Sequence, residues 1–132
     1  MNTNKAVLAV IDDEESVCKA LERLLRSAGF TVKTFINGAD FLRFLETGRP
    51  DCMVLDLCMM PMNGFAVLDR VALLSLELPV IIITGDDNEE TYERAMNYGI
   101  AAYLHKPVDG QVLLDAIAFA VGPGEDDPLI EK

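Results

Sequence analysis

The sequence predicts an α/β fold, a single-domain, doubly wound parallel sheet in which five strands alternate with five helices. The chain has 132 residues, a length typical of one domain. Apolar residues make up 51% of it and tryptophan is absent, which suits a core of aliphatic side chains and argues against intrinsic disorder. Apolar runs alternate with amphipathic runs from one end to the other. This alternation is typical of a parallel sheet with helices on both faces.

The first half of the chain contains two strand–helix units. Residues 6–11 form a continuous apolar run, as expected of a strand covered on both faces, and the helix after it is expected to stop at Gly29. Apolar and polar residues alternate over residues 30–34, which predicts a half-exposed strand at an edge of the sheet. A short helix over residues 39–46 completes the second unit.

The middle of the chain repeats the pattern with its most strongly apolar runs. A buried strand over residues 52–55 ends at Asp56, and a third helix follows a loop that contains proline, asparagine and glycine. The run over residues 80–83 is the most strand-like in the sequence and ends at Thr84. A polar helix over residues 89–97 comes next.

The last unit is a short alanine-rich strand over residues 100–104, which stops at Lys106, and a final amphipathic helix. Gly122 and the residues after it break the pattern. We therefore expect one folded domain over residues 1–122 and, over residues 123–132, an acidic tail or the start of a linker.

Charge and cysteine content exclude several classes of function. Lysine and arginine number 11 against 22 aspartate and glutamate residues, and the net charge of −11 repels nucleic acid and anionic membrane surfaces. The three cysteines form no CxxC pair, and an odd number gives no complete disulfide framework, which favours a reducing compartment. Because the sequence has no signal-peptide pattern and no apolar run long enough to span a membrane, a cytoplasmic protein is expected.

Five unusual residues follow the predicted strands. The carboxyl ends of parallel strands lie along one edge of the sheet, where α/β proteins of this type bind ligands. That edge is expected to carry three aspartates, a threonine and a lysine: Asp12, Asp13, Asp56, Thr84 and Lys106. Each alone has an ordinary interpretation, the aspartate pair as a helix cap and the others as turn, cap or surface residues. The set as a whole is poorly explained in that way.

Together these residues predict the chemistry of a phosphoryl group on a carboxylate. Neighbouring strands lie about 4.8 Å apart, so three crowded carboxylates need a proton or a cation, and Mg²⁺ prefers such oxygen ligands. Asp56 would be the nucleophile. Mg²⁺ and Lys106 would neutralise the phosphoryl oxygens, and the Thr84 hydroxyl would donate a hydrogen bond to one of them.

In this order and at these strand ends, the five residues resemble the receiver domains of two-component response regulators. The resemblance covers roughly residues 5–121, and segments 10–15, 83–85 and 103–107 are most similar to receivers of the FixJ and NarL type. It implies a flavodoxin-like fold with strand order 2-1-3-4-5. It also implies a phosphoryl group received from a histidine kinase or a phosphotransfer protein.

The resemblance further implies a metal site beside the phosphoacceptor. Asp56 would be the acceptor, Asp13 a direct ligand of Mg²⁺, and Asp12 a ligand acting largely through water. The backbone carbonyl of Cys58 would be a further ligand. One position departs from the family pattern, because methionine stands four residues after the acceptor, where the family usually has proline. That departure leaves the conformation of the loop open.

A switch is implied as well. Thr84 and Tyr103 would form the switch pair, Lys106 would bind the phosphoryl group, and its bond to Pro107 would be cis. The switching surface would lie on the fourth helix, the fifth strand and the fifth helix. Aromatic and methionine contacts there would come from Tyr92, Met96, Tyr98 and Tyr103. Self-association at this surface would give a two-fold homodimer that depends on phosphorylation.

Two other functions compete with a phosphorylation-controlled signalling module. A phosphohydrolase of the haloacid dehalogenase type also uses Asp, Thr or Ser, Lys and Mg²⁺, but with a DxD nucleophile on its first strand, whereas residues 56–58 read Asp-Leu-Cys on the third. A receiver-like domain without phosphorylation is disfavoured by the complete acidic set. We therefore expect a domain that is not an enzyme beyond its own phosphorylation and dephosphorylation. Its partners would be the kinase and a downstream output domain or protein.

Overall fold

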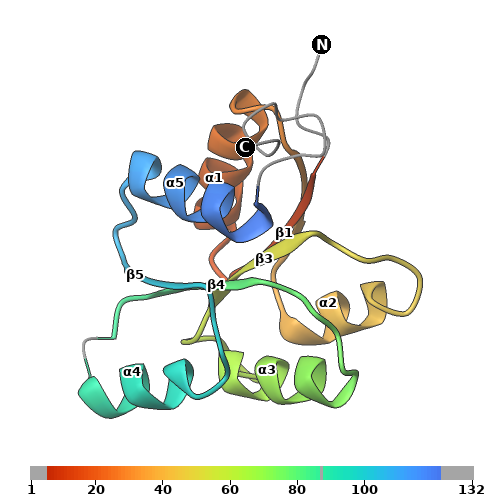
Figure 1. The fold of residues 1–132 in the computed structure, drawn as a ribbon, viewed down its shortest axis with the longest axis vertical. Helices are drawn as coiled ribbons and strands as arrows, with labels where there is room; N and C mark the ends of the chain where they lie inside the picture. The colour runs from red at the N-terminus through yellow and green to blue at the C-terminus, as the bar shows by residue number, and fades with distance from the viewer. Residues whose placement is uncertain (1–5, 87, 123–132) are drawn as a thin grey trace, which may run out of the picture.

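A five-stranded parallel sheet forms the middle layer of the protein (Figure 1). The computed structural model describes residues 6–86 and 88–122. Its strands are β1 (Val7–Ile11), β2 (Thr31–Phe35), β3 (Cys52–Asp56), β4 (Val80–Thr84) and β5 (Ala102–His105). They lie in the order β2-β1-β3-β4-β5, and every neighbouring pair is parallel. The predicted fold class and strand order are both confirmed. The predicted acidic tail or linker over residues 123–132 lies outside the described residues.

Helices cover both faces of the sheet. They are α1 (Glu15–Ser27), α2 (Gly38–Phe44), α3 (Gly64–Leu73), α4 (Glu89–Met96) and α5 (Gly110–Val121). Figure 1 shows α1 and α5 on one face and α2, α3 and α4 on the other. Among the described residues, no helix has the length and apolarity needed to cross a membrane.

Each face of the sheet has its own hydrophobic core, which explains the uninterrupted apolar runs in the sequence. Along β1, Leu8 and Val10 pack into the core under α1 and α5, while Ala9 and Ile11 pack into the core under α2 and α3. The strands β3 and β4 divide their side chains in the same way. A strand buried on both faces needs apolar residues at every position rather than at alternate ones.

The edge strand and the helix ends follow the sequence signals closely. In β2, Val32 is buried while Thr31 and Lys33 are exposed, as expected at an edge. Gly29, at φ +99°, stands just past the end of α1, a backbone conformation that glycine adopts without a steric penalty. Two elements differ most from their predicted bounds: β5, predicted over residues 100–104, runs from Ala102 to His105, and α2, predicted over residues 39–46, runs from Gly38 to Phe44.

Candidate functional site

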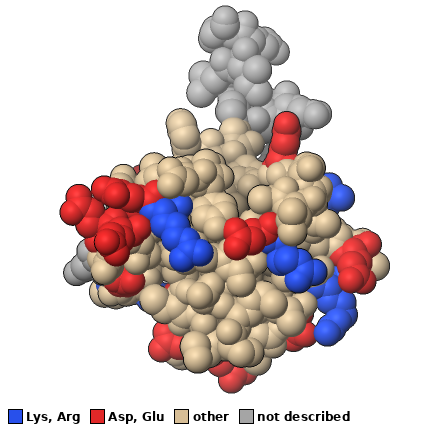
Figure 2. Space-filling view, turned by 90° about the horizontal axis from the view of Figure 1, so that it is seen from below, with Lys and Arg blue, Asp and Glu red and all other residues tan. Residues whose placement is uncertain are grey.

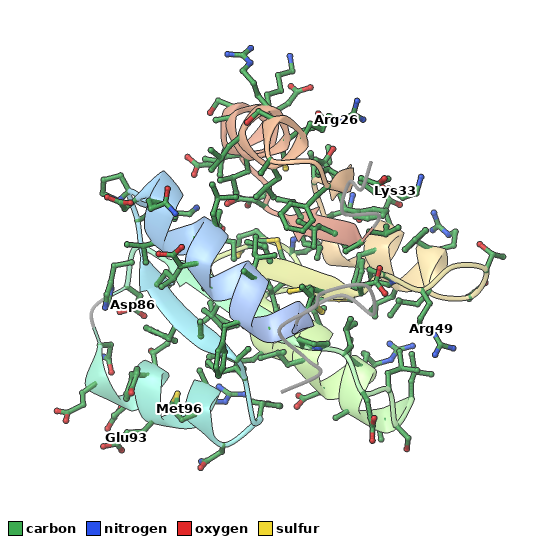
Figure 3. All side chains as sticks on the ribbon, turned by 45° about the horizontal axis from the view of Figure 1, so that its top comes forward. Arg26, Lys33, Arg49, Asp86, Glu93 and Met96 are labelled. Carbon is green, nitrogen blue, oxygen red and sulfur yellow. The ribbon has the colours of Figure 1, made fainter. Side chains whose placement is uncertain are left out.

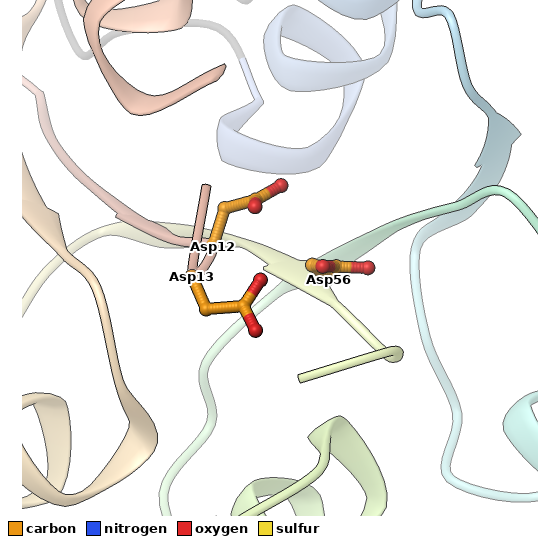
Figure 4. Close-up of side chains that lie close together, drawn as sticks. All are labelled: Asp12, Asp13 and Asp56. Atoms are coloured by element: carbon orange, nitrogen blue, oxygen red, sulfur yellow. The ribbon is translucent and has the colours of Figure 1, made fainter. Parts of the chain in front are cut away.

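Three aspartates meet where β1 and β3 end. Asp12 and Asp13 follow β1, and Asp56 is the last residue of β3, the neighbouring strand. In the described part of the chain, these three form a group in which one carboxylate oxygen of each lies within 4.8 Å of the others (Figure 4). Asp12 and Asp56 are buried and Asp13 is exposed. The sheet thus brings together the three carboxylates that the sequence singled out.

Asp12 makes both a local hydrogen bond and an ion pair. Its Oδ1 accepts a hydrogen bond from the backbone N–H of Glu14 at 2.9 Å, close to the start of α1. Its Oδ2 lies 2.9 Å from Nζ of Lys106. The N-cap of α1 is Glu14, so Asp12 makes a local turn hydrogen bond before the helix and does not cap it.

Asp56 is a carboxylate held where its charge is unfavourable. Only 2% of the residue is exposed, and burial is the main cause that raises its pKa above the usual value. The nearby Asp12 raises the pKa further, while the N–H of Cys58, which donates to Oδ1 at 3.1 Å, and Lys106 lower it. An additional positive charge at this position would therefore stabilise the ionised form.

Lys106 forms ion pairs with three acidic residues at this edge of the sheet. Its Nζ lies 2.9 Å from Asp12, 3.3 Å from Glu14 and 3.4 Å from Asp56. Burial opposes its charge, but these carboxylates outweigh that effect and raise the pKa of Lys106 above the usual value. Glu14 stands in an acidic run, and nothing in the sequence points to its partner 92 residues away.

The backbone also holds Lys106 in place. Its N–H donates to the carbonyl of Thr84 at 2.9 Å, which continues the pairing of β5 with β4. The bond between Lys106 and Pro107 is cis, as the resemblance implied. The backbone of Lys106 is therefore fixed at the same edge of the sheet as the aspartates.

Thr84 is fully buried beside the loop that follows Asp56. Its hydroxyl accepts a hydrogen bond from the N–H of Asp86 at 3.1 Å. The Sγ of Cys58 lies 3.5 Å from the same hydroxyl, a contact that the sequence analysis did not foresee. Asp86 in turn accepts from the Thr91 hydroxyl at 3.1 Å, so this side of the site is tied to α4.

The loop after Asp56 has a conformation that the sequence left open. The bond between Met60 and Pro61 is cis, Met60 is 77% exposed, and its N–H donates to Asp13 at 3.4 Å. Gly64 begins α3 directly against this loop. A Cβ at Gly64 would lie 2.7 Å from the Cα of Leu57 and 2.8 Å from the carbonyl oxygen of Asp56, so only glycine permits this approach.

The aromatic residues near α4 divide into two groups. The Tyr103 ring on β5 meets Tyr92 edge-on at 5.0 Å and His105 at 5.6 Å between ring centroids. Tyr98, expected on the same surface, turns toward α3. It stacks on Phe65 and donates to Asp69 at 2.5 Å. Tyr98 thus contacts α3, and its predicted place on the switching surface stays a prediction.

The donor set of the acidic group fits a hard divalent cation. Three carboxylates supply oxygen atoms only, and the exposed side chain of Asp13 leaves the group open to solvent. Mg²⁺ is bound by such ligands and keeps several waters. One of these carboxylates, Asp56, is buried, and Lys106 and the Thr84 hydroxyl lie at the same edge of the sheet; together these are the groups needed to form and hold an acyl phosphate.

Comparison with known proteins supports one family. The family model described as "Response regulator receiver domain" matches residues 8–118. The chain is 37% identical over 105 residues to the DNA-binding transcriptional regulator NtrC of Escherichia coli K12, covering 80% of this chain and 22% of NtrC. It is 34% identical over 108 residues to the transcriptional regulatory protein FixJ of Rhizobium meliloti, covering 82% of this chain and 53% of FixJ.

Solved structures agree with this assignment. A response regulator receiver protein from Burkholderia phymatum superposes with a TM-score of 0.81 at 36% identity, covering 90% of this chain and 97% of that one. Both curated relatives are longer than this chain, which spans 22% of the length of NtrC and 53% of the length of FixJ.

Proposed function

Because this chain belongs to the response regulator receiver family, we propose that Asp56 is the residue that accepts the phosphoryl group. The chain is a phosphoacceptor signalling module rather than a true enzyme. The observation that carries the proposal for Asp56 is that this buried member of the acidic group has Oδ2 3.4 Å from Nζ of Lys106. Asp12 also pairs with Lys106, at 2.9 Å, but it follows β1 rather than β3, whose neighbour β4 ends at Thr84, and Asp13 is exposed.

The reaction transfers one phosphoryl group to a carboxylate oxygen. The Asp56 oxygen attacks phosphorus, the bond from phosphorus to the donor breaks, and the donor leaves with the electron pair. The ammonium group of Lys106 can neutralise the negative charge that develops on the phosphoryl oxygens, and the Thr84 hydroxyl can donate a hydrogen bond to one of them. In the absence of phosphate, Lys106 is held by Asp12 and Glu14, so it is already positioned.

Mg²⁺ is the cation that we propose for the acidic group. Asp13 and Asp56 would bind it directly, the carbonyl of Cys58 would be a third ligand, and Asp12 would act through water. When bound, the ion would neutralise charge on the phosphoryl oxygens.

The wider assignments are also proposals. A histidine kinase or a phosphotransfer protein would supply the phosphoryl group, residues 1–122 would form the receiver, and a cytoplasmic location suits such a partner. Membership of the FixJ and NarL subtype is supported by the match to FixJ, although NtrC is at least as similar. Phosphorylation would draw the Thr84 hydroxyl toward Asp56 and shift Tyr103, changing the populations of two pre-existing states.

Incubation with acetyl phosphate tests the function directly. With Mg²⁺, the wild-type chain is expected to gain one phosphoryl group as an acyl phosphate that is stable in acid and labile in base. Intact-mass analysis and peptide mapping should place the group on Asp56, and a chelator should prevent its formation. Modification of any other residue would contradict the assignment. Multiple turnovers of an aryl phosphate would instead favour the phosphohydrolase.

Thermal melts test the metal site. Mg²⁺ at tenfold to hundredfold excess over its Kd is expected to stabilise the wild-type fold by roughly 1–3 kcal/mol, because it binds the folded state preferentially. Asp13→Asn should lose most of this gain. Glu46→Gln, which removes an exposed carboxylate just after α2, should retain it. An equal gain in both variants would contradict the role of Asp13.

A further inference from the structure

The switching surface proposed above has an unusual charge pattern. Residues 86–121, which include α4, β5 and α5, carry seven carboxylates and two cations in the sequence. The cations are Arg94 and Lys106. The carboxylates are Asp86, Asp87, Glu89, Glu90, Glu93, Asp109 and Asp115. Figure 2 shows acidic side chains gathered on the side of the molecule where α4 lies. The excess of negative charge is therefore local as well as overall.

Both cations in this segment contact residues outside α4 and β5. Arg94 lies with its guanidinium 4.0 Å from the centroid of the Phe65 ring on α3. Lys106 is held by Asp12, Glu14 and Asp56 at the acidic site. In Figure 3 the labelled cations Arg26, Lys33 and Arg49 lie on the opposite side of the molecule from Glu93 and Met96.

A hollow lined by aromatic side chains lies between α4 and β5, next to the carboxylate of Glu89. It has a volume of about 350 Å³ and is lined by Asn88, Glu89, Tyr92, Tyr103 and His105. Tyr92 and Tyr103 meet edge-on within it, and Tyr92 is 44% exposed. Aromatic faces beside a carboxylate favour a cationic side chain. Arginine fits best, because its planar group stacks on a ring and pairs with a carboxylate at the same time.

We propose that the α4–β5 face binds a lysine- and arginine-rich segment of a partner protein, with one arginine inserted into the aromatic hollow. This inference rests on the proposed function, since it names the chemistry of the partner for the switching surface. The net charge of −11 would speed the encounter with a cationic partner.

A second copy of the chain fits this face poorly. In a two-fold dimer the same patch meets itself, so Glu89 and Glu93 of one copy would approach carboxylates of the other. The helix α5 carries no lysine or arginine that could pair with them. Like charges brought together across an interface disfavour association.

Matched synthetic peptides test the proposal. The first has a central arginine flanked by lysines, the second has norleucine in place of the arginine, and the third has glutamate in place of every cation. Amide-resolved NMR titration of the full chain should show the arginine peptide shifting residues of α4 and β5. The norleucine peptide should bind several-fold more weakly, and the glutamate peptide should produce no shifts. Equal binding of the arginine and norleucine peptides, or shifts confined to other elements, would overturn the proposal.

Two charge-matched variants locate the contact. Glu89→Gln combined with Glu93→Gln should weaken binding of the arginine peptide about fivefold, since each exposed ion pair contributes a modest amount. Glu46→Gln combined with Glu77→Gln removes the same charge from exposed positions after α2 and before β4, and should change binding less than twofold. Equal weakening by both pairs would show a general charge effect and overturn the local site.

The same titration separates this inference from the proposed function. Beryllofluoride with Mg²⁺, a phosphoryl mimic, should shift the amides around Asp56 whether or not any peptide binds. If those shifts occur and the arginine peptide still does not bind, the partner chemistry is wrong and the receiver function stands. If the chain instead self-associates through α4 and β5 with beryllofluoride, as measured by sedimentation, a second copy is the occupant and the proposal is overturned.

Discussion

The Asp56→Asn variant is expected to take no phosphoryl group from acetyl phosphate, a complete loss, while keeping its fold. The amide has no carboxylate oxygen to attack phosphorus. It also removes a buried negative charge next to Asp12, where burial already raises the pKa of Asp56. Lys106 keeps its two nearer partners, Asp12 and Glu14. In the absence of metal, the free energy of unfolding should therefore rise, by on the order of 1 kcal/mol.

Two measurements on the same preparation check this result. Intact mass after treatment with acetyl phosphate and Mg²⁺ reports the modification, and urea unfolding with a chelator present reports the stability. Asp115→Asn on the exposed side of α5 is the matched control, and it should be phosphorylated like the wild type. A phosphorylated Asp56→Asn chain would mean that another side chain accepts the group. A large loss of its stability would mean that Asp56 is structurally required.

Adding one methyl group at Gly64 is expected to be damaging. In Gly64→Ala the new Cβ would lie 2.7 Å from the Cα of Leu57 and 2.8 Å from the carbonyl oxygen of Asp56. Both are backbone atoms, so the clash can be removed only if α3 or the loop after Asp56 moves. Overpacking of this kind costs roughly 1–3 kcal/mol of stability. The displaced loop should also slow phosphorylation of Asp56.

Gly85→Ala is the matched control for that variant. It lies next to Thr84 at the same edge of the sheet, but a Cβ there meets nothing within 4 Å. Its stability should remain within about 0.5 kcal/mol of the wild type. Denaturant unfolding and the rate of acyl phosphate formation should therefore separate the two alanine variants. Indistinguishable results would show that the loop yields easily.

The sequence was most informative where one physical cause dominates. The strands β3 and β4 were placed almost to the residue, because a strand buried on both faces must be apolar throughout. The strand β5 was less well placed. Ile100 and Ala101 are as apolar as the strand itself, and nothing in the sequence shows that they belong to the turn after Gly99, which has a φ of +74°.

The candidate site was predictable as a set of residues but not as a set of contacts. Its aspartates, threonine and lysine follow strands whose ends must meet at one edge. The pairing of Lys106 with Glu14 and the approach of Cys58 to Thr84 depend on side-chain conformations. Those are set by packing between segments far apart in the chain. The contact of Tyr98 with α3 was also not predictable, because helical spacing does not fix the direction of a side chain beyond the end of the helix.

The two outer strands of the sheet bear on how the protein resists aggregation. An outer strand can recruit another chain through its backbone, and many such contacts lead to insoluble assemblies. Here Lys33 stands exposed in the middle of β2, so a chain adding at that side would have to desolvate an ammonium group. On the other side β5 is only four residues long and offers a short template. Both outer strands of this sheet, which is rich in isoleucine, valine and leucine, are thus poor templates for edge-to-edge pairing.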